Sequence, residues 1–245
     1  MYPSPYHVPF TSPHMRANIV KILLAVGAIA TGISLLVEAL SLGFPVSEDQ
    51  EFDANPAGFA LALIIFLLAV LELLIYIATV VFFLVWLYRA YANLKIFDPS
   101  NVLDYSPGMA VGSFFIPFAN LVIPYRAVRE TWQKSGTPEE SAFALPGAPA
   151  IFPLWWTFWL AAGFVGKISM RISFDESVSH STATMIGIVA GALSIIAAVF
   201  AFFVVDAIDK KQEETTAKLG LGPFSRPQPP PAYMRDPVMD QGSGL

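Results

Sequence analysis

Four runs of apolar residues, each long enough to cross a bilayer as a helix, constrain this chain more than any other feature. The hydrocarbon core of a bilayer is about 30 Å thick and needs about 20 helical residues. Only 13% of the residues are charged, about half the share found in soluble domains. We therefore expect an all-α polytopic membrane protein, with spans in Asn18–Leu42, Ala57–Leu87, Ile151–Ile172 and Thr182–Val205.

A fifth apolar segment, Pro107–Trp132, is interrupted by Pro117, Asn120 and Pro124. Proline removes a backbone donor and clashes with the carbonyl four residues earlier, and in lipid every backbone polar group needs an internal partner. The segment therefore predicts a broken helix that re-enters the membrane or lies in its interface. Asn120 is expected to bond the freed carbonyl groups or to line a small polar cavity, as in transporters. A bent helix packed on the bundle is the alternative.

Lysine and arginine give the predicted orientation, because short cytoplasmic loops carry an excess of them. If Pro107–Trp132 re-enters, the chain has four spans and both termini are cytoplasmic; if it crosses, it has five spans and the loop after it is exported. We expect the first layout, because the loop 43–56 lacks positive charge and almost all basic residues then share one side. These residues are Arg16, Lys21, Arg89, Lys95, Arg126, Arg129, Lys134, Lys210, Lys211 and Lys218.

Trp86, Arg89 and Asn93 are spaced so that they share one face of a helix. This face predicts either a polar surface that meets the interrupted segment, with Arg89 bound to a lipid phosphate or to Glu130, or a Trp and Arg anchor at the membrane interface. Further candidate residues on the same basic side are Arg126 and Arg129, with Trp132 as a structural residue.

Glu72 is the acidic residue nearest the middle of a predicted span. An ionisable side chain there costs about 2.5 kcal/mol or more, so it is by default a functional candidate. It predicts a proton-binding or cation-binding carboxylate, with a neutral or hydrogen-bonded glutamate as the alternative. Glu38 and Lys167 lie toward the outer ends of their runs, at a similar predicted depth, where they are able to pair.

Small residues recur every four positions in the last apolar run, at Ala183, Gly187 and Gly191. This spacing lets two helices approach closely. It predicts an internal seam of the bundle or the face of a dimer, and it leaves the oligomeric state open.

Several classes of site are excluded or unsupported. The chain has no cysteine, which excludes disulfides and thiolate chemistry. His7, His14 and His180 are far apart in sequence, and none has a carboxylate at ligand spacing, so neither a metal site nor a cofactor is predicted. No catalytic motif is visible, and no basic stripe for nucleic acid accompanies the net charge of −5. The charged residues Asp206, Asp209, Lys210, Lys211, Glu213 and Glu214 are expected on a solvated helix surface.

The two ends of the chain are polar and rich in proline. Residues 1–17 and 220–245 are expected to be disordered tails, on either side of a membrane helical domain at 18–219. Pro230, Pro231 and Tyr233 match the short proline motif that WW domains bind, although a flexible tail is the simpler interpretation.

Two clusters resemble a bacterial family of uncharacterised integral membrane proteins that is known as a domain of unknown function. The first is W-L-Y-R-A-Y-A-N, with Trp86, Arg89 and Asn93, and the second runs from Ser106 to Trp132 around F-I-P-F-A-N-L-V-I-P-Y. The resemblance covers about 61–205. It implies a several-helix fold in the bacterial inner membrane, and it implies no activity.

We expect the protein to be a non-enzymatic membrane scaffold, whose proline-rich tails and basic cytoplasmic side recruit a protein partner. The alternative is a small transporter or channel component that uses the broken helix, Asn120 and Glu72.

Overall fold

The computed structural model describes residues 12–43, 56–100, 102–142, 147–175 and 177–221. Four helices in this part of the chain are long and apolar enough to cross a membrane. They are α1 (His14–Gly43), α2 (Pro56–Phe97), α6 (Ile151–Ile172) and α7 (His180–Lys218). The expected helical membrane bundle is therefore confirmed.

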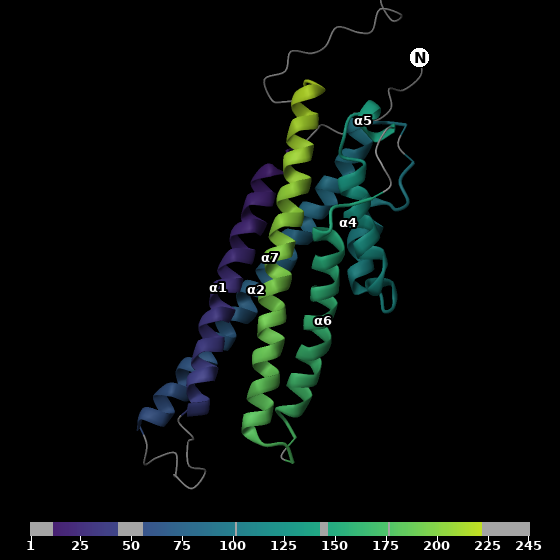
Figure 1. The fold of residues 1–245 in the computed structure, drawn as a ribbon. Coiled ribbons are helices and arrows are strands. Elements are labelled where there is room, and N and C mark those ends of the chain that lie inside the picture. The colour runs from purple at the N-terminus through teal and green to yellow at the C-terminus, as the bar shows by residue number, and fades with distance from the viewer. Residues whose placement is uncertain (1–11, 44–55, 101, 143–146, 176, 222–245) are drawn as a thin grey trace, which may run out of the picture.

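Helix α1 packs against α2 and α7, and α7 also packs against α6, while α2 runs obliquely behind α1 and α7 (Figure 1). Helix α2 has 42 residues and α7 has 39, which at 1.5 Å per residue makes each about 60 Å long. Both therefore extend well beyond a hydrocarbon core of about 30 Å. Helices α1 and α6 begin, and α2 and α7 end, on the same side of the bundle. We call this side the capped end.

The interrupted segment forms a hairpin of short helices against the capped end, not a fifth long helix (Figure 1). Ser106 caps the first helix and Pro107 opens it, and Pro124 lies in the first turn of the last. Proline suits the first turn, because the N–H that it lacks has no partner there. The elements are α3 (Pro107–Gly112), η2 (Ser113–Phe115), η3 (Ala119–Leu121) and α4 (Ile123–Gln133).

The chain reverses at Phe118, next to Pro117, where the backbone φ is 63°. This left-handed conformation is costly for a residue with a side chain. Phe118 is also 85% exposed. The tip of the hairpin is therefore an apolar surface, made of Phe115, Ile116, Phe118, Leu121 and Val122.

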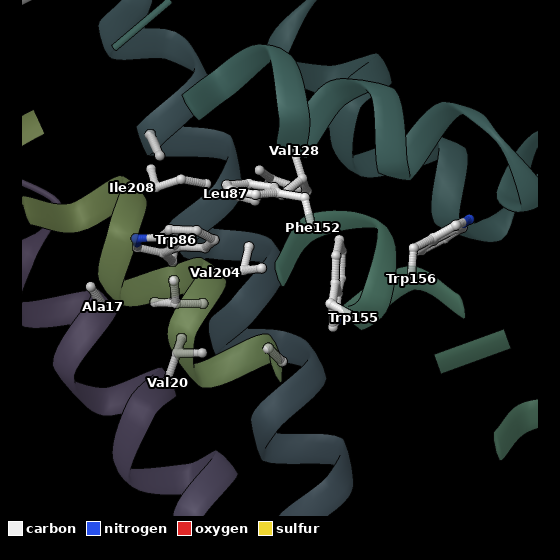
Figure 2. Packing of buried hydrophobic residues seen from close by; sticks show 13 residues of the cluster. Ala17, Val20, Trp86, Leu87, Val128, Phe152, Trp155, Trp156, Val204 and Ile208 are labelled. Atoms are coloured by element: carbon white, nitrogen blue, oxygen red, sulfur yellow. The ribbon is translucent and has the colours of Figure 1, made fainter. Parts of the chain in front are cut away.

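The buried core lies at the capped end rather than along the spans. Trp86 and Leu87 of α2 occupy its centre, and side chains from α1, α4, α6 and α7 surround them (Figure 2). By contrast, the large apolar side chains between Phe59 and Val85 of α2 are mostly exposed. This distribution fits a membrane protein, because lipid covers the apolar faces of its spans.

The ends of the described helices lie close to the boundaries predicted at 17/18 and 219/220. Helix α1 already begins at His14, inside the tail predicted at 1–17. At the other end, Gly220 takes a φ of 63°, and the N–H of Leu221 donates to the Thr216 carbonyl at 3.0 Å. This closes α7 with a Schellman motif. Residues 1–11 and 222–245 lie outside the described residues, so the disordered tails stay predictions.

The glycines of α7 lie at the seam with α1. A Cβ atom built on Gly191 would lie 2.6 Å from Cδ2 and 3.2 Å from Cγ of Leu35. Gly187 of α7 faces Glu38 of α1, and a Cβ atom built on Gly187 would lie 3.6 Å from Glu38 Oε2. The absence of a side chain at Gly191 is therefore what allows α1 and α7 to approach so closely.

We expect Gly191→Ala to destabilise the protein relative to Gly32→Ala, which adds its methyl group where no atom lies within 4 Å. Both changes gain the same helix propensity, so their difference isolates overpacking, about 1–3 kcal/mol. Thermal unfolding of the purified protein in detergent measures the difference. Adding Leu35→Ala to the Gly191→Ala variant should remove this difference. Equal unfolding midpoints for Gly191→Ala and Gly32→Ala would show that the seam is loosely packed.

Candidate functional site

The C-terminal part of α7 carries a buried polar stripe. Asp209, Gln212 and Thr215 are each at most 1% exposed. Gln212 Nε2 donates to the Ala90 carbonyl at 2.8 Å and to Ser135 Oγ at 3.0 Å, and Thr215 Oγ1 donates to the Ser135 carbonyl at 2.7 Å. The expectation of a solvated surface is therefore wrong here, because α2 and the end of α4 cover this side of α7.

Lys211 closes the C-terminal end of α4. Its ammonium donates to the carbonyl groups of Trp132 at 2.8 Å and Gln133 at 3.4 Å, and it lies 4.3 Å from the centre of the Trp132 ring. The last carbonyls of a helix lack partners within it and carry the negative end of its dipole. One side chain of α7 thus donates to two carbonyl groups at the end of α4.

Glu130 of α4 ties the hairpin to α2 and to the loop before α3. Tyr91 Oη donates to Glu130 Oε2 at 2.5 Å, and Lys134 Nζ donates to Oε1 at 2.6 Å. The N–H of Asp104 donates to Oε1 at 2.9 Å, and the N–H of Tyr105 donates to Tyr91 Oη at 3.1 Å. Since Glu130 is only 5% exposed, these bonds compensate for burying its charge.

An aromatic cluster on α6 holds the tip of the hairpin. Trp156 Nε1 donates to the Leu121 carbonyl at 3.0 Å, and Phe114 meets the rings of Trp156 and Trp159 edge to face, at 6.4 and 6.3 Å. Asn120, which we expected to bond freed carbonyls, is half-buried beside Leu121. The donor for the carbonyl at the turn is therefore supplied by another helix.

Charged residues of α1 and α7 meet at the capped end. His14 Nδ1 lies 2.9 Å from Asp209 Oδ2 and 2.9 Å from Glu213 Oε1. Lys21 Nζ lies 3.1 Å from Asp206 Oδ1 and 3.4 Å from Asp209 Oδ2. The spacing of histidines and carboxylates in the sequence did not indicate this cluster, because the fold brings together residues almost 200 positions apart.

The intramembrane carboxylates also form a group. Glu72 of α2 lies near Glu38 of α1, and Gly187 of α7 contacts both Glu38 and Ser169 of α6. Ser169 and Trp156 are 13 positions apart on α6, or about 20 Å. The structure therefore separates Glu72 from Asn120, which the transporter hypothesis had combined. Lys167, the predicted partner of Glu38, is an exposed residue.

The predicted binding face of α2 is mostly internal. Trp86 is fully buried and so is not an interfacial anchor, and Asn93 is 3% exposed. Arg89 is half-buried, while the carboxylate of Glu130 is bonded by Tyr91 and Lys134 and not by Arg89.

The two arginines of α4 differ in their surroundings. Arg126 is exposed and Arg129 is half-buried, and the Nε atom of Arg129 is buried with no hydrogen-bond partner among the described residues. The structure does not bring either of them to the carboxylates of the described chain. Arg126 is therefore the more accessible of the two to an anionic ligand.

Sequence reasoning missed Tyr91 and Gln212, which hold the capped end, and it named Glu130 only as a candidate partner of Arg89 rather than of Tyr91 and Lys134. The ionic cluster did have a usable signal. His14 and Lys21 on α1 recur with helical spacing, as do Asp206, Asp209 and Glu213 on α7. These stripes of opposite sign lie at the ends of two spans predicted to share one side of the membrane.

Residues 55–210 match the family model described as Domain of unknown function (DUF4328). The match covers more than half of the chain and contains the whole hairpin. No curated protein and no solved structure matches.

We expect Tyr91→Phe to loosen the loop before α3, because it removes the acceptor of the Tyr105 N–H and the donor to Glu130. Leaving buried partners unsatisfied should cost about 1–3 kcal/mol. Hydrogen–deuterium exchange of a peptide that contains Asp104 and Tyr105 measures the loosening. Tyr88→Phe, at a position 45% exposed, is the control, and equal exchange in the two variants would contradict the role of Tyr91.

Proposed function

The chain belongs to the DUF4328 family of unknown function, and we propose that it is a non-enzymatic membrane scaffold that presents both of its proline-rich ends from one side. The observation that carries this proposal is the junction of α1 and α7. His14, at the start of α1, lies 2.9 Å from Glu213 near the end of α7. The described chain therefore begins and ends at the capped end, so partners of the two tails would meet there.

The chemistry of the capped end supports a structural role. Its buried polar residues Glu130, Ser135, Gln212 and Thr215 all bond other helices or the hairpin. A catalytic or transport site needs polar groups that remain available to a ligand. These four residues instead join α2, α4 and α7 to one another.

We further propose that the hairpin enters the lipid from the cytoplasmic side of a bacterial inner membrane. Its tip exposes Phe115, Phe118 and Leu121, and the ring of Phe118 is held outward by a strained backbone. Lipid would cover such a surface. The exposed Arg126 follows the tip by a few residues, where it would reach the phosphate groups of the same leaflet.

A transporter or channel component is the second candidate, and the proximity of Glu38 and Glu72 favours it. Because Asn120 and the hairpin lie about 20 Å away along the bundle, such a function would rest on the two carboxylates and not on the broken helix.

The proposed layout predicts which side of the membrane a single cysteine faces. Because the chain contains no cysteine, Glu139→Cys in α5 (Pro138–Ala142) and Phe174→Cys between α6 and α7 each introduce one exposed thiol. An impermeant thiol reagent on intact cells should label position 174, and it should label position 139 only after the membrane is opened. Labelling of position 139 from outside would contradict both the orientation and the cytoplasmic scaffold.

Removal of the C-terminal tail separates the scaffold from the transporter. Truncation after Leu221 retains the Schellman cap of α7, so the helical domain should fold unchanged. Proximity labelling in cells should then lose partners that the full chain captures, with membrane insertion intact. A matched variant, Tyr233→Ala, tests the tail motif alone. An unchanged set of neighbours with both changes would contradict the scaffold. A transporter should keep its ion flux without the tail, so loss of neighbours on truncation together with no measurable flux through the full chain would contradict the transporter.

A further inference from the structure

We propose that His14, Asp209 and Glu213 form a binding site for a divalent transition-metal cation, which joins the start of α1 to the end of α7. The ligand atoms are His14 Nδ1, Asp209 Oδ2 and Glu213 Oε1, which all lie within 4.8 Å of one another. This inference does not depend on the scaffold function, since a metal clamp at this place would serve any role of the bundle.

The geometry suits a small cation. His14 Nδ1 lies 2.9 Å from each of the two carboxylate oxygens. Ligands bonded to zinc at 2.0–2.2 Å in a tetrahedron are about 3.4 Å apart. Each carboxylate oxygen would therefore need to move only about half an ångström away from His14 Nδ1 to admit an ion.

Asp209 gives an independent indication of a missing ligand. Its side chain is 1% exposed, and its second oxygen, Oδ1, is buried with no hydrogen-bond partner among the described residues. A buried carboxylate oxygen without a partner is expensive. Both oxygens of Asp209 are bonded to the same carbon, so a cation bound to Oδ2 is within reach of Oδ1. Bidentate coordination would therefore give Oδ1 a partner.

The surroundings complete the site. The side chains of His14 and Glu213 are 43% and 47% exposed, which provides a path for the ion and leaves room for water as a further ligand. His14 Nε2 lies 2.9 Å from the Asn18 amide. If the amide is turned so that its oxygen accepts the ring N–H, it orients the imidazole as outer partners of metal-bound histidines do.

Lys21 already lies near this site, with its Nζ atom 3.4 Å from Asp209 Oδ2. Its closer contact is to Asp206 Oδ1, at 3.1 Å, so Asp206 is able to retain Lys21 when a metal ion binds Asp209. The ligand set of one imidazole and two carboxylates favours zinc, manganese or iron(II). Calcium prefers six to eight oxygen ligands and should bind weakly.

The test uses the full chain, purified in detergent and stripped with a chelator. Zn²⁺ titrated calorimetrically should bind with one ion per chain and raise the unfolding midpoint, and Ca²⁺ should do neither. Co²⁺ should give a visible absorption band, which reports a protein-bound ion directly. His14→Ala and Glu213→Gln should each weaken Zn²⁺ binding at least tenfold and abolish the band.

Glu214→Gln changes the neighbouring exposed carboxylate and should leave binding unchanged. Circular dichroism and the metal-free unfolding midpoint show whether each variant is folded, and Glu213 is exposed enough for its substitution to be tolerated. No binding to the wild-type chain, or the same affinity in His14→Ala or Glu213→Gln as in Glu214→Gln, would overturn the proposal and leave the cluster as an ion-pair network.

Discussion

Side chains of other helices bond the carbonyl groups that the hairpin exposes at its turn and at its end, and the arrangement of the capped end depends on these bonds. Trp156 of α6 supplies the donor at the turn, and Lys211 of α7 supplies the donors at the end of α4. Backbone groups that are neither hydrated nor hydrogen-bonded are costly. The hairpin can therefore depart from regular helical structure only where side chains of α6 and α7 bond its carbonyl groups. The helices in turn gain a cover for their apolar ends.

Helix α7 connects the three parts of the molecule. Gly191 brings it against Leu35 of α1 within the predicted spans, Asp209 meets His14 and Lys21 at the capped end, and Gln212 reaches α2 and α4. A straight helix about 60 Å long fixes the distances between these contacts. The junction of α1 with α7, the ionic cluster and the hairpin are therefore linked through one helix.

The intramembrane carboxylates and the polar groups of the capped end lie in two separate regions of the described chain. Glu38 and Glu72 lie within the predicted spans, about 20 Å along the bundle from the tip of the hairpin. The groups at the capped end lie outside the lipid in the proposed layout, where water is available to the exposed members of the cluster. A metal ion or a protein partner would thus meet the capped end without affecting the intramembrane carboxylates.

The sequence by itself determined the class of the protein, the four spans and the break in Pro107–Trp132, because apolar length and the missing N–H of proline act locally. It also placed the small residues of α7 on one stripe, since helical spacing is fixed. It did not determine that Pro107 and Pro124 start helices, that Trp86 is buried or that Trp156 bonds the turn. Only the tertiary structure decided these points and brought His14 to Asp209 and Glu213. The physical reason is that burial and hydrogen-bond partners depend on which helix ends pack together, and residues almost 200 positions apart carry no local sign of that packing.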